Sequence, residues 1–148
     1  MLNKKTKIII VEDDKEILES LKEILRSEGY EVDTAVDGEE GIRKCEAKSF
    51  DLVLLDIKLP GIDGTKVLEI LHKRFPGMIK IMITGYPSLE NAVASLKKGA
   101  DAYLMKPVNP ASLLKIITEK MNERARKNKL RIESGAFSRL KSIRCDRL

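Results

Sequence analysis

Short runs of branched apolar residues alternate along the chain with longer segments in which apolar residues recur every three or four positions. The run Ile8-Ile9-Ile10-Val11 contains no polar position, which is typical of a strand buried on both faces of a sheet. Runs of similar character predict five strands in all, over residues 7–11, 30–35, 50–55, 79–84 and 102–105.

The segments between these runs have helical periodicity. Residues 17–25 place apolar side chains on one face, the segment ends at Gly29, and Asp14 is suited to cap its start. The last such segment opens with Asn109 followed by Pro110, a favourable pair at the beginning of a helix. Five strands alternating with five helices predict an α/β fold, with a doubly wound parallel sheet.

The alternating pattern fades towards the C-terminus. The body of the domain is expected to end near residues 121–127, and from Arg126 the chain is polar and basic, with an interruption at Ser134-Gly135. Apolar residues after that point indicate one more short amphipathic turn, namely Phe137, Leu140, Ile143 and Leu148. We therefore expect one domain over residues 1–122, followed by a basic tail or truncated linker over residues 123–148.

The composition of the 148-residue chain suits a single globular domain, because 43% of the residues are hydrophobic and 34% charged. The sequence shows neither an apolar run long enough to cross a bilayer nor a secretion signal, so we expect a cytoplasmic protein without membrane contact. Cys45 and Cys145 lie too far apart to suggest a disulfide framework or a zinc site. Cys45 is interpreted as a small hydrophobe, and His72 as structurally incidental.

The net charge of +5 is unevenly distributed. Residues 122–148 contain 9 Lys and Arg against 3 Asp and Glu, whereas residues 1–121 are almost neutral. Such a tail either binds nucleic acid or another acidic surface, or is simply a solvated segment. The tail has neither interleaved aromatic residues nor a known nucleic-acid-binding motif, so both interpretations stay open.

Polar residues follow the predicted strands at the points where ligands collect in open α/β sheets. Glu12 and Asp13 follow the first strand, Asp56 the third, Thr84 ends the fourth, and Lys106 follows the fifth. Several carboxylates held close together need a compensating cation. Carboxylate oxygens without His or Cys favour Mg²⁺, whose shell a backbone carbonyl near residue 58 would complete.

Each of these residues also has an ordinary structural use. Acids after a strand often cap the next helix, and Thr-Gly and Lys-Pro pairs are common in loops. Taken together, they suit phosphoryl transfer to an aspartate nucleophile, Asp56. Mg²⁺ and the Lys106 ammonium would neutralise the phosphoryl oxygens, and the Thr84 hydroxyl would donate a hydrogen bond.

Four segments in order carry a resemblance to a known family, over residues 8–14, 54–64, 83–86 and 99–107. Residues 5–122 resemble the receiver domain of two-component response regulators. The Gly85-Tyr86-Pro87-Ser88 turn and the spacing from Asp56 to Thr84 are most similar to receivers attached to enhancer-binding transcription activators. The chain is too short to contain the ATPase or DNA-binding domain of such activators, so it is either a single-domain regulator or part of a longer protein.

The resemblance implies a flavodoxin-like (βα)5 sheet of strand order 2-1-3-4-5 and a cis bond before Pro107. It implies that Asp56 accepts a phosphoryl group from a histidine kinase or phosphotransfer protein, and that the protein is a switch rather than an enzyme. The implied Mg²⁺ ligands are Glu12, Asp13, Asp56 and the backbone carbonyl of Lys58. Glutamate is longer than the aspartate common at position 12, so its metal contact is either direct or through water.

Thr84 and Lys106 are the implied phosphoryl contacts. Thr84 and Tyr103 would together alter the surface formed by the fourth helix, fifth strand and fifth helix. That surface would control a downstream protein, an output domain or a homodimer.

Two other functions remain as alternatives. An aspartate-nucleophile phosphohydrolase also uses Mg²⁺ and lysine, but it typically has a second Asp two residues after the nucleophile, where this chain has Lys58. An interaction module that keeps the fold without phosphorylation is the other alternative. The complete set of acids, threonine and lysine argues against it.

Overall fold

A computed structural model describes residues 5–85 and 88–146 of the chain, with side chains described up to residue 135. The chain divides into two compact units, Met1–Ile116 and Ile117–Leu148, and each is treated by itself below. Tyr86, Pro87 and Leu148, which figure in the predicted turn and tail, lie outside the described residues.

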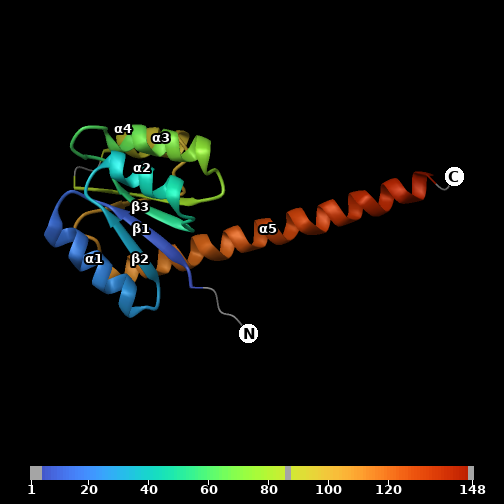
Figure 1. Cartoon of the computed structure of the whole chain (residues 1–148), viewed down its shortest axis with the longest axis horizontal. Coiled ribbons are helices and arrows are strands. Elements are labelled where there is room, and N and C mark those ends of the chain that lie inside the picture. The colour runs from blue at the N-terminus through green and yellow to red at the C-terminus, as the bar shows by residue number, and fades with distance from the viewer. Residues whose placement is uncertain (1–4, 86–87, 147–148) are drawn as a thin grey trace. The chain divides into compact units, whose positions relative to one another are not determined.

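The first unit is built on a sheet of five parallel strands in the order β2-β1-β3-β4-β5 (Figure 1). Apolar β-branched and leucine residues dominate the three central strands, as expected where helices cover both faces. The strands are β1 Lys7–Val11, β2 Glu31–Ala35, β3 Leu52–Asp56, β4 Ile79–Thr84 and β5 Ala102–Met105. The predicted fold class and strand order are confirmed, although β3 extends one residue further than predicted and so includes Asp56.

Helices follow every strand and begin at capping side chains. The Asp14 carboxylate accepts hydrogen bonds from the Glu16 and Ile17 amides, which confirms its predicted capping role. Asp37, Asp63 and Ser88 cap the next three helices in the same way. The helices are α1 Lys15–Ser27, α2 Gly38–Ala47, α3 Gly64–Arg74, α4 Leu89–Lys97 and α5 Pro110–Asp146.

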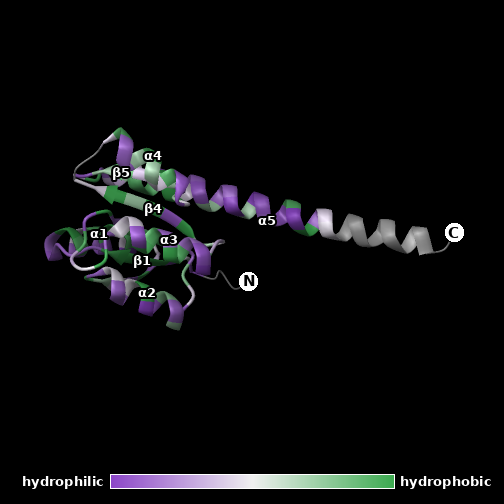
Figure 2. Ribbon diagram, turned by 90° about the horizontal axis from the view of Figure 1, so that it is seen from above, coloured by the Kyte–Doolittle hydropathy of each residue, from purple (hydrophilic) through white to green (hydrophobic). Residues whose placement is uncertain are grey.

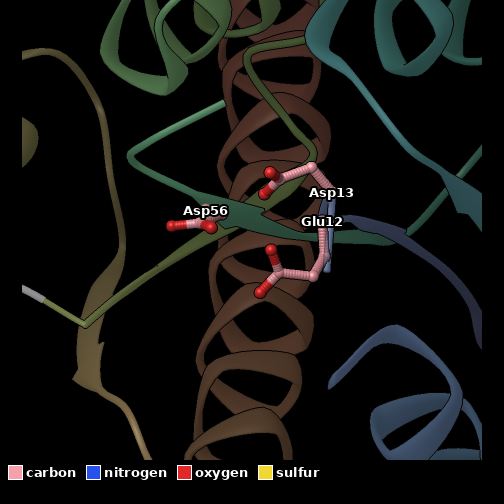
Figure 3. Close-up of side chains that lie close together, drawn as sticks. All are labelled: Glu12, Asp13 and Asp56. Atoms are coloured by element: carbon pink, nitrogen blue, oxygen red, sulfur yellow. The ribbon is translucent and has the colours of Figure 1, made fainter. Parts of the chain in front are cut away.

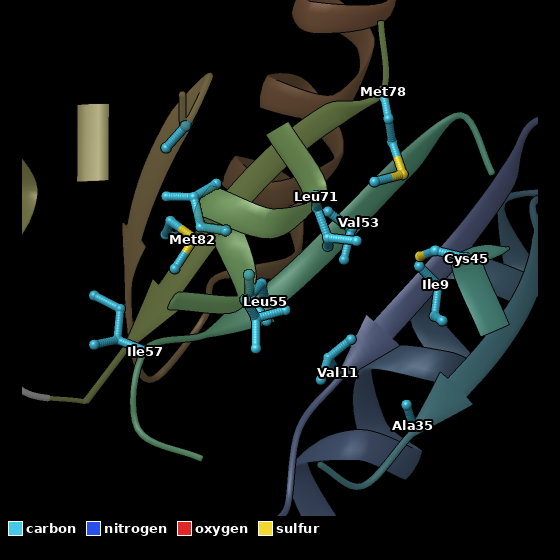
Figure 4. Close-up of a cluster of buried hydrophobic side chains, with 13 residues drawn as sticks. Ile9, Val11, Ala35, Cys45, Val53, Leu55, Ile57, Leu71, Met78 and Met82 are labelled. Carbon is cyan, nitrogen blue, oxygen red and sulfur yellow. The ribbon is translucent and has the colours of Figure 1, made fainter. Parts of the chain in front are cut away.

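The core lies between the sheet and its covering helices. Alternate residues of β1 and β3, and Met82 of β4, pack with buried residues of α2 and α3 (Figure 4). Cys45 belongs to this cluster, and burial raises the pKa of its thiol to about 11, so it is an unreactive apolar residue as predicted. The rigid central strands fix the positions of the residues at their ends.

One charged side chain is buried near the amino end of β4. Lys80 is 1% exposed, and its ammonium donates to the Met78 carbonyl oxygen at 2.7 Å. The Lys80 Nζ also lies 3.3 Å from Nδ1 of His72 on α3. Burial lowers the pKa of Lys80, since an uncharged amine is favoured away from water.

Helix α5 begins as predicted, with the Asn109 side chain accepting a hydrogen bond of 3.1 Å from the Ser112 amide. The predicted interruption at Ser134-Gly135 is wrong, because the helix continues to Asp146. A single glycine costs a helix about 1 kcal/mol relative to alanine, and good helix formers on either side can outweigh that cost. The side chains of Phe137, Leu140, Ile143 and Cys145 lie outside the described residues.

The hydropathy of the second unit differs from that of the sheet. Residues 125–135 of α5 are exposed all round the helix, and polar residues predominate among them (Figure 2). None of the helices in the described part of the chain combines the length and apolar character needed to cross a membrane.

Candidate functional site

Asp56 ends the fully buried strand β3, between β1 and β4. The residue is 6% exposed, so its carboxylate emerges from the sheet at a fixed position. One carboxylate oxygen accepts a hydrogen bond from the Lys58 amide at 3.2 Å, and the other accepts one from the Lys106 ammonium at 2.9 Å. Asp56 is therefore held from both sides.

Two further acids lie beside Asp56, directly after the adjacent strand β1. Glu12, Asp13 and Asp56 each place a carboxylate oxygen within 4.8 Å of those of the other two (Figure 3). Glu12 is 2% exposed, whereas Asp13 is exposed to solvent. The structure thus brings together the three acids that the sequence selected, and Asp14 is excluded because it caps α1.

Lys106 compensates part of this negative charge. Its ammonium pairs with Glu12 and with Asp56, although it lies 50 residues from Asp56 in the chain. The Lys106 amide donates to the Thr84 carbonyl oxygen at 2.8 Å, and the bond to Pro107 is cis, as the resemblance implied. Three carboxylates therefore face one ammonium, which leaves an excess of negative charge when all are ionised.

The pKa of Glu12 reflects its surroundings. Burial, assisted by Asp56, raises the pKa of Glu12 to about 7, although Lys106 opposes the rise. For Lys106, burial alone would lower the pKa, but its two carboxylate partners outweigh burial and raise it. The ammonium of Lys106 is thus kept charged, while Glu12 takes up a proton more readily than an exposed glutamate does.

Thr84 and Tyr103 occupy neighbouring strands. Thr84 is 1% exposed at the end of β4, and Tyr103 pairs in register with Met82 on the same strand. Tyr103 is half-buried against the core, and its hydroxyl is buried without a hydrogen-bond partner among the described residues. Both residues lie where the sequence placed them, at or near the edge that holds the acids.

Gly64 is a residue of the site that sequence reasoning identified only as part of a turn. A Cβ at this position would lie 2.0 Å from the Asp56 carbonyl oxygen and 2.7 Å from the Ile57 Cα. The Gly64 amide also donates to the Ile57 carbonyl oxygen at 2.8 Å. The start of α3 thus contacts the backbone beside Asp56 directly, which only glycine allows.

The donor set fits a hard divalent cation. Carboxylate oxygens are available at Glu12, Asp13 and Asp56, and this group contains no His or Cys. Mg²⁺ is usually bound by a small number of carboxylates, with water and phosphate oxygens as its remaining ligands. The Lys58 side chain is exposed, whereas its backbone amide donates a hydrogen bond to the Asp56 carboxylate. The backbone of Lys58 therefore lies close to the three carboxylates.

The match to a known family decides the identity of the domain. The sequence model of the response regulator receiver domain matches residues 8–118, three quarters of the chain. The chain belongs to this family. Receiver domains are parts of signalling regulators, and the motifs quoted above fall within the matched range.

Individual relatives agree with this assignment. The transcriptional regulatory protein GlrR of Escherichia coli K12 is 34% identical over 125 residues, covering 84% of this chain but only 28% of GlrR. A CheY-like receiver from Methanospirillum hungatei is 55% identical, with a TM-score of 0.82, and the match covers 84% of this chain and 99% of that structure. The matched part of the chain thus covers nearly the whole of that receiver structure but little more than a quarter of GlrR.

A third relative was crystallised with ligands. The CheX-CheY-BeF3-Mg²⁺ complex from Borrelia burgdorferi contains a chain that is 30% identical, with a TM-score of 0.76 over 78% of this chain and 89% of that one.

Proposed function

We propose that this receiver accepts a phosphoryl group on Asp56 from a phosphohistidine of a kinase or phosphotransfer protein. The P–N bond to histidine breaks, the imidazole nitrogen keeps its electron pair, and a P–O bond forms to an Asp56 carboxylate oxygen. The observation that carries the proposal is the fixed Asp56 carboxylate, between two further acids and the Lys106 ammonium. The crystallised relative that holds BeF3 and Mg²⁺ supports it.

The residues around Asp56 have separate roles in this proposal. Glu12, Asp13, Asp56 and the Lys58 carbonyl would hold Mg²⁺, which when bound neutralises charge on the transferring group. Lys106 would leave its carboxylate partners in part to bind a phosphoryl oxygen, and Thr84 would donate its hydroxyl to another. A phosphohydrolase function is less well supported, because the position two residues after Asp56 is lysine rather than an acid.

The test is phosphorylation by acetyl phosphate, followed by intact mass. The wild-type protein should gain one phosphoryl group only with Mg²⁺, and Asp56→Asn should gain none. Asp13→Asn should need a higher Mg²⁺ concentration for the same rate, since it removes one proposed ligand. No gain by the wild-type protein, or an equal gain by Asp56→Asn, would overturn the proposal.

The proposed output is a change at the surface of α4, β5 and the first turns of α5. Large apolar side chains are exposed on α4 and β5, namely Leu89, Val93, Leu96 and Met105. The unpartnered Tyr103 hydroxyl lies on β5 and the buried Thr84 on β4, so a hydrogen bond rearranged at Thr84 could be transmitted to this surface. A downstream protein, an output domain or a second copy would bind there.

Light scattering tests whether a second copy of the chain binds to this surface and forms a homodimer. Addition of BeF3 and Mg²⁺ should raise the molar mass towards that of a dimer, and Leu96→Lys should prevent the rise while still binding BeF3. An unchanged mass in the wild-type protein would exclude the homodimer.

A further inference from the structure

One segment of the second unit has an unbalanced charge. Residues 126–131, which we call the basic segment, contain Arg126, Lys127, Lys129 and Arg131 and no acid. All four side chains are exposed, and no ion pair is found for any of them within the described part of the chain. The preceding turn differs, because Lys120 there pairs with Glu123 at 3.3 Å.

The like charges work against the helix that carries them. Lys127 and Arg131 are four positions apart and Arg126 and Lys129 three apart, so each pair shares a face of α5. Like charges at these spacings destabilise a helix by about 0.2–0.5 kcal/mol per pair. Glu123 lies four positions before Lys127 and Glu133 four after Lys129, but neither pair forms an ion pair within the described residues. Residues 125–135 are exposed on every side, so burial of an apolar face does not compensate for this repulsion either. A ligand that supplies anions would relieve it.

The arrangement of the two pairs indicates the shape of that ligand. Helical geometry separates the Arg126–Lys129 face from the Lys127–Arg131 face by about 150°. A flat anionic surface would meet only one of these faces. A helix in the major groove of a DNA duplex, about 12 Å wide, has a phosphate backbone on each side. The deep, narrow major groove of duplex RNA does not admit side chains in this way.

We propose that the basic segment binds duplex DNA through its phosphates, with α5 lying in the major groove. Six helical residues span about 9 Å, along which a duplex carries about five phosphate charges, enough for the four cations. The basic segment has no aromatic residue for stacking on single strands. Since the contacts are to phosphates, binding should be strongly dependent on salt and insensitive to base sequence.

The test is fluorescence anisotropy of the full-length chain with a labelled 20-base-pair duplex of arbitrary sequence (about two helical turns) over a series of salt concentrations. Four phosphate contacts predict that log K falls against log salt with a slope of about −3.6, or about 150-fold between about 50 and 200 mM. Neutralising the basic segment with Arg126→Gln, Lys127→Gln, Lys129→Gln and Arg131→Gln should reduce the magnitude of the measured slope by about 3.6, the contribution of these four cations. Glutamine keeps a good helix propensity, which circular dichroism would verify.

The matched control neutralises four exposed cations of the first unit, by Arg26→Gln, Arg43→Gln, Lys73→Gln and Lys97→Gln. It changes the net charge equally and should retain the wild-type slope. The proposal is overturned if the wild-type protein does not bind at low salt, or if both variants lose affinity equally. It is also overturned if duplex RNA or vesicles with anionic lipid bind as tightly as DNA. None of these measurements requires phosphorylation of Asp56.

Discussion

Each edge of the sheet holds a lysine, buried at the amino edge and partly buried at the carboxyl edge, and the two lysines differ in their partners. At the carboxyl edge, Lys106 pairs with Glu12 and Asp56, and these carboxylates raise its pKa despite burial. At the amino edge, the Lys80 ammonium contacts a backbone carbonyl and His72, and burial lowers its pKa although the charge of Asp101 opposes the shift. A buried ammonium is suited to phosphoryl chemistry where the fold supplies anions that keep it charged.

The acids at the two edges differ in the same way. At the amino edge, Asp51 accepts a hydrogen bond from the Lys7 amide at 2.9 Å, and Asp101 accepts one from the Lys80 amide at 2.8 Å. These carboxylates satisfy the first amide of β1 and the second amide of β4. At the carboxyl edge, Asp56 and Glu12 also accept hydrogen bonds from amides, those of Lys58 and Asp14, but they share the Lys106 ammonium as well. Together with Asp13 they form a cluster of carboxylates, which the amino edge does not show among the described residues.

The largest expected effect is a difference in phosphorylation rate between variants of the two lysines. Lys106→Met should slow phosphorylation of Asp56 by acetyl phosphate about 10²- to 10³-fold, because it removes a fixed cation from the transferring group. Lys80→Met is the matched control at the other edge and should leave the rate unchanged. Initial rates of mass gain at saturating Mg²⁺ give both numbers. Equal slowing in the two variants would mean that the edges are not functionally distinct.

A second prediction compares a glycine at each edge. Gly64→Ala should lower the free energy of unfolding by about 3 kcal/mol, because its Cβ overlaps the backbone at Asp56 and Ile57. Gly77, just before β4, has open space around it, so Gly77→Ala should have no effect or add up to about 1 kcal/mol. Urea unfolding of both variants measures the difference. A tolerated Gly64→Ala would contradict the close approach of α3.

The pH dependence of stability provides a third prediction. The pKa of Glu12 is about 7 in the folded protein and 4.5 in the unfolded chain, so the folded state binds more protons between these values. Without divalent metal, the free energy of unfolding should therefore fall as pH rises from about 4.5 to 7, by up to about 3 kcal/mol. Glu12→Gln should flatten this part of the curve. An identical slope in that variant would assign the dependence to other groups.

The smallest predicted effect is on stability at the amino edge. Lys80→Met replaces a buried charge by an apolar side chain of similar length and should stabilise the fold by about 1 kcal/mol. Thermal unfolding at neutral pH measures the change. A loss of stability would show that the bond from Lys80 to the Met78 carbonyl contributes more than burial of the ammonium costs.

The sequence predicted the sheet and its acidic edge well, for physical reasons. Apolar runs such as Ile8-Ile9-Ile10-Val11 are typical of covered strands, and parallel strands bring their carboxyl ends to one edge, so Asp13 and Asp56 were expected to meet. The roles of Gly64 and Lys80 were not predicted. A glycine in a turn and a lysine in a strand each have several common uses, and only three-dimensional contacts distinguish them.

The sequence predicted the end of the last helix less well than it predicted the sheet. Ser134-Gly135 indicated a break, yet α5 continues through both residues to Asp146. A single glycine is weak evidence for the end of a helix when the residues around it favour helix. Its unfavourable propensity is small compared with the hydrogen bonds that the helix keeps by continuing through it.

The most direct test of the central claim is to identify the residue that carries the phosphoryl group. The chain would be phosphorylated with acetyl phosphate and Mg²⁺, and the acyl phosphate reduced with borohydride, which converts a phosphoaspartate into homoserine. Peptide mass mapping should find homoserine at position 56 and nowhere else, and only when both phosphodonor and Mg²⁺ were present. Homoserine at position 13, or at no position, would contradict the assignment of Asp56 as the phosphoacceptor.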